Sequence, residues 1–123
     1  MQQKRKILGA VTTPVGDTSD PAADSASLVR LAISRRFCLA AVYNKTAMTL
    51  APQILYTRHD EPYVDAVVVE RDGQPPKEVK LGVFKIVGLK GLALSGRPFL
   101  AFPGFDANAE KYLGNTIIAV TAP

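Results

Sequence analysis

The sequence is poor in the residues that build disulfides, metal sites and many catalytic centres. It has one cysteine, one histidine and no tryptophan among 123 residues. A single cysteine cannot form an intrachain disulfide, and this pair of counts excludes the His-pair and Cys-rich patterns of zinc sites. We therefore expect no metal, no other cofactor and a reducing compartment such as the cytoplasm.

Long apolar runs are also missing. No stretch approaches the roughly 18 apolar residues that a membrane-spanning helix needs. A basic cluster at 4–6 precedes an apolar run at 7–11, but export signals need about 7–15 apolar residues. We expect a soluble, cytoplasmic protein that does not contact membranes.

No catalytic constellation can be assembled from the remaining residues. Cys38 lies within an apolar run and His59 within a polar turn, which predicts a small buried thiol and an exposed loop histidine. Asp65 and Glu70 are five residues apart on one expected strand, hence on opposite faces. No phosphate-cradling glycine loop is present. An enzyme is therefore the weakest hypothesis, and we expect a non-catalytic domain that acts by binding.

The charge that is present is mildly basic. Fifteen Lys and Arg against eleven Asp and Glu give a net charge of +4. Residues 1–24 hold three of each sign, so the excess lies in residues 25–123. This excess is compatible with an anionic partner such as a nucleotide or nucleic acid, although basic side chains can also serve solubility alone.

Periodicity changes along the chain divide it into an arm and one domain. The segment 12–24 is rich in small and polar residues, which predicts a disordered arm over residues 1–24. A helix should begin near Ser25, bury Leu28, Leu31 and Ala32 on one face, and end at 35–36. Strands are then expected at 37–43, 46–56, 63–70, 78–87, 92–95 and 114–120, with a helical turn at 106–112.

Aromatic and basic side chains are spread over these expected strands. A small bent sheet that presents aromatic rings for base stacking and cations for phosphates can hold single-stranded nucleic acid. The alternative is that most of these aromatic residues fill the core, because they alternate within apolar strands. The pattern leaves both interpretations open.

The order of the elements resembles the WYL domain, a ligand-sensing module of bacterial transcriptional regulators. Four segments carry this resemblance: 28–43, 61–64, 83–86 and 105–114. Within them, Tyr63-Val64 resembles the end of the name-giving tripeptide, and 83–86 resembles the family's Phe-Arg-Leu strand. The resemblance implies a mainly β fold in which an N-terminal helix precedes a small, strongly bent, five- to six-stranded Sm-like barrel.

The chain departs from the family at Pro62, Gly82 and Val87-Gly88, where Trp, Arg and Asp-Arg are usual. These departures predict a ligand pocket that is altered or lost. We expect a stand-alone regulatory module that binds a nucleotide or short single-stranded nucleic acid. The predicted ligand-binding residues are Tyr63, Lys85, Arg35, Arg36 and Arg58.

Two kinds of partner remain open besides the ligand. Residues 1–24 are too few for a DNA-binding domain, so a separate partner protein is expected to supply that part. The alternative function is a protein–protein interaction or homo-oligomerisation module, acting through an uncovered sheet edge or through the N-terminal arm.

Overall fold

The computed structural model describes residues 21–121, and most of the predicted arm lies outside the described residues. The helix α1 spans Pro21–Arg35, so it begins within the segment predicted to belong to the arm. Proline is tolerated in the first helical turn because a backbone N–H at that position has no hydrogen-bond acceptor within the helix. Asp24 in the first turn and Arg35 in the last complement the helix dipole.

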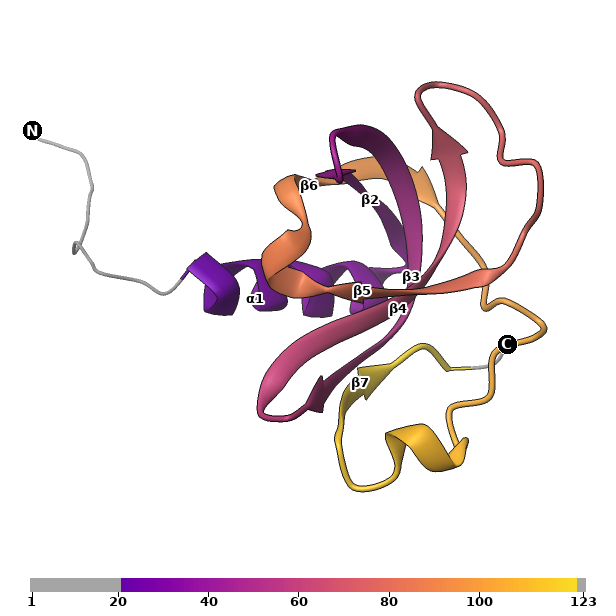
Figure 1. Ribbon diagram of the computed structural model, residues 1–123. Helices are drawn as coiled ribbons and strands as arrows, with labels where there is room; N and C mark the ends of the chain where they lie inside the picture. The colour runs from indigo at the N-terminus through magenta and orange to yellow at the C-terminus, as the bar shows by residue number, and fades with distance from the viewer. Residues whose placement is uncertain (1–20, 122–123) are drawn as a thin grey trace, which may run out of the picture.

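Six antiparallel strands follow α1 and form one sheet (Figure 1). They are β2 (Phe37–Tyr43), β3 (Thr46–Arg58), β4 (Glu61–Arg71), β5 (Leu81–Lys85), β6 (Lys90–Pro98) and β7 (Thr116–Ala119), with the 3-10 helices η1 (Ile86–Gly88) and η2 (Glu110–Tyr112). The strand order is β5-β4-β3-β2-β6, and β7 pairs with the far end of β3. The predicted mainly β fold with an N-terminal helix is confirmed.

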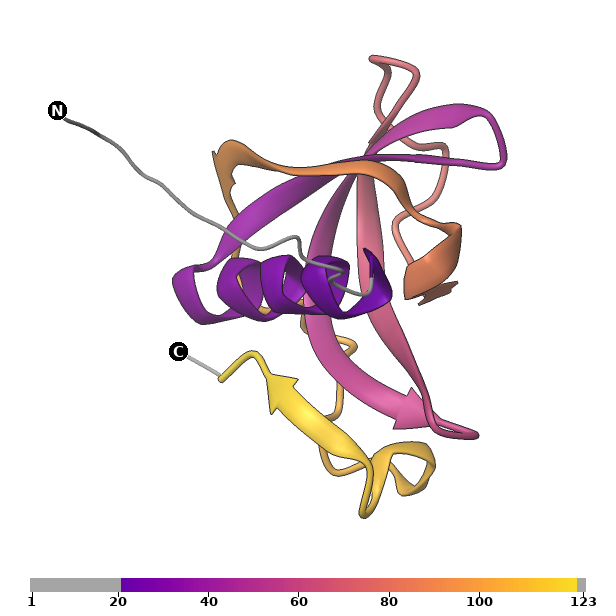
Figure 2. The ribbon, with the colours of Figure 1, turned by 90° about the vertical axis from the view of Figure 1, so that its left-hand side faces the viewer.

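Closure into a barrel is the part of the prediction that differs. The chain passes from β5 through η1 to β6, which pairs with β2 at the other end of the sheet. Among the described residues, β5 and β6 do not pair with each other, so the sheet stays open between them. It is nevertheless strongly bent, and its strands curve around α1 (Figure 2). Register shifts in β3 at 49–50 and 52–54 accompany this bend, as expected of β-bulges.

All six predicted strands are present: β2 has the predicted limits of 37–43, and the other five differ at one or both ends. β3 and β4 are longer than expected because their turn uses only His59 and Asp60, both at positive φ. Two residues of this conformation make the tight turn that joins antiparallel strands. β5 is shorter than the predicted 78–87, and the predicted helical turn at 106–112 is reduced to η2.

The face of the sheet that α1 covers carries the main core. The helix buries Val29, Ala32 and Ile33 against the sheet, whereas the predicted Leu28 and Leu31 are only half-buried. The buried side therefore lies one residue further along the helix than predicted. The buried strand residues of this cluster include Leu39, Leu50, Leu55, Val64 and Phe84.

The opposite face of the sheet is covered by the chain between β6 and β7. Gln53, the extra residue of the β3 bulge, is fully buried and its Oε1 accepts a hydrogen bond from Phe102 N–H at 2.8 Å. Its backbone carbonyl accepts one from Val120 N–H at 2.7 Å. Gln53 in the bulge thus holds both the covering segment at Phe102 and the chain after β7 at Val120.

In the part of the chain that the structure describes, no helix is long and apolar enough to cross a membrane.

Candidate ligand-binding surface

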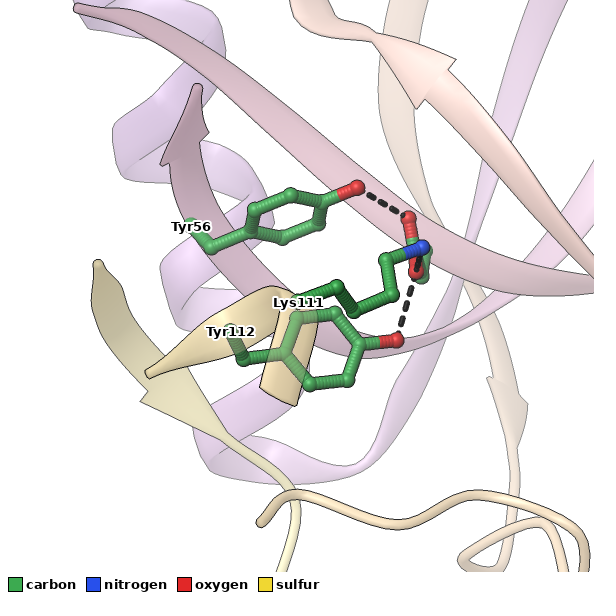
Figure 3. A network of polar contacts seen from close by, with 4 residues as sticks. Tyr56, Lys111 and Tyr112 are labelled. Carbon is green, nitrogen blue, oxygen red and sulfur yellow. Dashed lines mark hydrogen bonds and ion pairs between the residues drawn. The ribbon is translucent and has the colours of Figure 1, made fainter. Parts of the chain in front are cut away.

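A buried carboxylate organises the sheet face opposite α1. Asp65 on β4 is fully buried and receives three donors (Figure 3). The hydroxyls of Tyr56, on β3, and Tyr112, in η2, each donate to it at 2.6 Å. The Lys111 ammonium lies 2.9 Å from the same carboxylate. This network fastens η2 to the sheet.

The carboxylate changes the acidity of both phenols. Burial raises the pKa of Tyr56, and the hydrogen bond to Asp65 raises it further. The pKa of Tyr112 is raised by the same two causes in the same order. A phenol that donates to a carboxylate inside the protein resists ionisation because its anion would lose that bond and face a like charge. These hydroxyls therefore act as fixed donors rather than as bases.

Beside this network lies a tyrosine flanked by cations. Tyr63 on β4 is directly opposite Lys85 on β5 in the strand register. The Arg58 guanidinium lies 5.8 Å from the centre of the Tyr63 ring, a distance typical of a cation–π contact. We call Arg58, Glu61, Tyr63 and Lys85 the Tyr63 surface.

The Tyr63 surface is continuous with the Asp65 network. The rings of Tyr56 and Tyr63 stack with centroids 6.0 Å apart and an interplanar angle of 28°. The Lys111 side chain is half-exposed, and its ammonium lies 5.7 Å from the centre of the Tyr56 ring. Alternation along the strands explains this arrangement, since Tyr63 and Asp65 are two residues apart and share one face.

Glu61 partly neutralises the positive charge of the Tyr63 surface. Its carboxylate lies 3.1 Å from the Lys85 ammonium, and both side chains are about half-exposed. The hydrogen bond and the charge of Glu61 raise the pKa of Lys85. An exposed ion pair of this kind contributes little to stability. An incoming anion would therefore compete with Glu61 for Lys85.

Two of the five predicted ligand-binding residues lie elsewhere. Arg36 follows α1 and donates through its guanidinium to the backbone oxygen of Thr121 and, at 2.9 Å, to its Oγ1. The backbone carbonyl of Arg36 accepts a hydrogen bond from Phe99 N–H at 3.0 Å. Arg35 is the last residue of α1. The structure brings Tyr63, Lys85 and Arg58 together, and it places Arg35 and Arg36 at the junction of α1 and β2.

Sequence reasoning did not identify Asp65, Lys111 or Tyr112 as parts of the site. A signal was available for Asp65, because one acidic residue stood within a valine-rich strand. A buried acid needs donors, and two of the three, Lys111 and Tyr112, lie 46 and 47 residues further along the chain. Nothing local predicts that pairing.

The remaining sequence predictions for this region concern single residues. Cys38 is fully buried, as predicted. His59 is exposed in the β3–β4 turn, also as predicted. Over residues 21–121, no three His, Cys, Asp or Glu side chains are grouped to hold a metal ion.

The glycines that depart from the family pattern lie against aromatic rings. A Cβ added at Gly82 would lie 3.1 Å from the Phe84 ring, and one at Gly88 would lie 3.1 Å from the Tyr43 ring. Both distances are tighter than ordinary contacts. A larger residue at either position would have to displace a neighbouring ring.

Comparisons with protein-family models, with curated proteins and with solved structures find no match for this chain. The resemblance to the WYL domain thus stays a prediction from the sequence.

Proposed function

We propose that this domain is a non-catalytic binding module that holds an anionic ligand, a nucleotide or short single-stranded nucleic acid, on the Tyr63 surface. The observation that carries the proposal is the position of Tyr63 between two cations, Lys85 opposite it and Arg58 near its ring. An aromatic ring can stack on a base while flanking cations contact phosphates. A third cation, Lys111, lies 5.7 Å from the centre of the Tyr56 ring and is paired with Asp65.

The sequence resemblance supports a regulatory role for this binding. Tyr63 and Lys85 lie in the segments that carry the sequence resemblance to the WYL domain, and they are neighbours in the strand register. We place the protein in the cytoplasm on the grounds of its single cysteine. In this proposal a separate protein would supply any DNA-binding part.

Binding to phosphates must weaken as salt rises, because cations on the protein displace condensed counterions. We would titrate a fluorescent short single-stranded oligonucleotide, and unlabelled nucleotides in competition, at several salt concentrations. Lys85→Gln should weaken oligonucleotide binding and make the negative slope of log affinity against log salt shallower by about 0.7. Lys45→Gln removes the same charge from the exposed β2–β3 turn and should leave both quantities nearly unchanged.

Glu61 provides a test in the opposite direction. Glu61→Gln frees Lys85 from its ion pair and should tighten oligonucleotide binding. Equal behaviour of Lys85→Gln and Lys45→Gln, or the absence of salt-dependent binding to any nucleotide or oligonucleotide, would overturn the proposal.

A specific observation also favours the second function, interaction through a sheet edge. Within the described range 21–121, β6 pairs only with β2. It is exposed over most of its length, and Leu94 is 38% exposed. Such an edge can pair with another chain. Sedimentation velocity over a range of concentrations should then show self-association that Leu94→Lys abolishes. A monomer at every concentration would exclude self-association through β6.

A further inference from the structure

A concave site lies on the same sheet face as the Tyr63 surface and shares no residue with it. It is a cavity of about 430 Å³ between the sheet and the segment 97–103. Cys38, Ala51 and Val67, from three neighbouring strands, form a buried cluster there, and Phe99 and Phe102 pack against it. Small-molecule pockets span roughly 300–1,000 Å³ and are mainly apolar, so this cavity falls within the range for a small ligand.

The polar side chains that line this cavity differ in whether they already have partners within the protein. Gln53 is occupied, since its Oε1 accepts from Phe102 N–H at 2.8 Å and its Nε2 donates to the Ala51 carbonyl at 3.1 Å. Arg97 is the only charged residue among those that line the cavity. It is exposed, and over the described part of the chain no ion pair involves it.

The charge of Arg97 also reaches the buried side of the cavity. Burial raises the pKa of the Cys38 thiol, and the positive charge of Arg97 opposes that rise. Arg97 and Cys38 both line the cavity, so the cation borders the same apolar space as the buried thiol.

From this geometry we propose that the cavity binds a small apolar carboxylate, such as a medium-chain fatty acid, with its hydrocarbon part among the apolar walls and its carboxylate on Arg97. The walls favour a hydrocarbon because its burial removes apolar surface from water. An arginine favours a carboxylate because it can donate two parallel, charge-assisted hydrogen bonds. None of the residues that line the cavity belongs to the Tyr63 surface.

Octanoate and octanol are matched probes for this site, because they differ mainly in the charged group. Calorimetric titration of the full chain should show octanoate binding more tightly than octanol. Arg97→Gln should reduce octanoate affinity about ten- to a hundredfold and leave octanol affinity nearly unchanged, as expected from the loss of hydrogen bonds to a charged group. Lys45→Gln is the charge-matched control and should bind octanoate like the unaltered protein.

A second measurement locates the bound probe. Octanoate should shift the methyl NMR signals of Val67 and Val69, both of which line the cavity. Val69→Phe should block both probes by filling the space. Equal affinities for octanoate and octanol, no binding of either, equal effects of Arg97→Gln and Lys45→Gln, or methyl shifts confined to other residues would each overturn the proposal. Lys85→Gln should not affect octanoate, which separates this test from that of the Tyr63 surface.

Discussion

Asp65 is the one charged side chain that is fully buried among the described residues. An isolated carboxylate is costly to bury, but this one accepts two phenol hydroxyls and contacts one ammonium. The donors come from β3 and η2, so a single side chain joins the sheet to the segment before β7. It also holds Tyr56 in place beneath the stacked Tyr63 ring.

Removing this carboxylate should therefore destabilise the fold. Asp65→Ala leaves two buried hydroxyls without their acceptor, and each such group costs about 1–3 kcal/mol. We expect the free energy of unfolding to fall by about 3 kcal/mol or more, measured by chemical denaturation. Glu78→Ala, at an exposed position, should change it by no more than about 0.5 kcal/mol. A similarly small loss for both variants would contradict the role assigned to Asp65.

The two buried phenols predict a distinctive alkaline titration. The pKa values of Tyr56 and Tyr112 are raised in the folded protein, whereas an unfolded tyrosine has a pKa of about 10. Their contribution to stability is thus present below pH about 10 and is lost as pH rises from there through the folded values. Absorbance titration should show two of the four tyrosines ionising only at strongly alkaline pH or on unfolding.

Phenylalanine substitutions assign this late titration. Tyr56→Phe and Tyr112→Phe should each remove one late-ionising group. If all four tyrosines of the unaltered protein ionised together near pH 10, the two hydroxyls could not be donating to Asp65 in the way described.

At the scale of elements, the β3 bulge determines how the segment between β6 and β7 lies on the sheet. The side chain of Gln53 accepts from Phe102 N–H, while its backbone carbonyl accepts from Val120 N–H. These two bonds from one residue respond differently to a side-chain substitution. Measuring the two hydrogen bonds independently therefore distinguishes the role of the Gln53 side chain from that of the β3 backbone.

Gln53→Leu keeps the bulk of the side chain and removes its acceptor. We expect the Phe102 amide to lose protection from hydrogen exchange and the Val120 amide to retain most of it, as measured by NMR. Equal loss at both amides would show that the substitution unfolds the bulge itself. Unchanged protection at Phe102 would show that the side chain of Gln53 does not hold the segment.

Local patterns predicted most of the elements because their causes are local. Alternation identified β2, its position after the turn identified β3, and β-branched content identified β4. The turn at Asn44-Lys45 is formed by two residues at positive φ, as a tight hairpin requires. The limits of β5 and of the last helical turn were less accurate. Those limits depend on pairing with distant strands, which periodicity does not contain.

At the scale of the whole molecule, the sequence predicted the bent mainly β fold, but the Sm-like barrel that the WYL resemblance implies is not closed. Closure depends on where the chain goes after β5, and here η1 carries it directly to the far edge, beside β2. The Tyr63–Lys85 pair could be anticipated because both residues lie in short, recognisable segments. The Asp65 network could not, because it joins residues from distant parts of the chain.

The two faces of the sheet differ in the features that they carry. One face packs on α1 and forms the main core. The other carries the Asp65 network, the Tyr63 surface and the cavity beside Arg97. A ligand on this second face would meet residues held by the sheet and by η2, so binding should require little rearrangement of the backbone.

Binding on the Tyr63 surface can be tested by amide NMR spectra recorded during titration with a short single-stranded oligonucleotide. We expect salt-sensitive shifts that are largest at Arg58, Tyr63 and Lys85, extend to Lys111, and are absent at the β2–β3 turn. Shifts centred on β6 or on the turn at Lys45, or no shifts at low salt, would contradict this expectation.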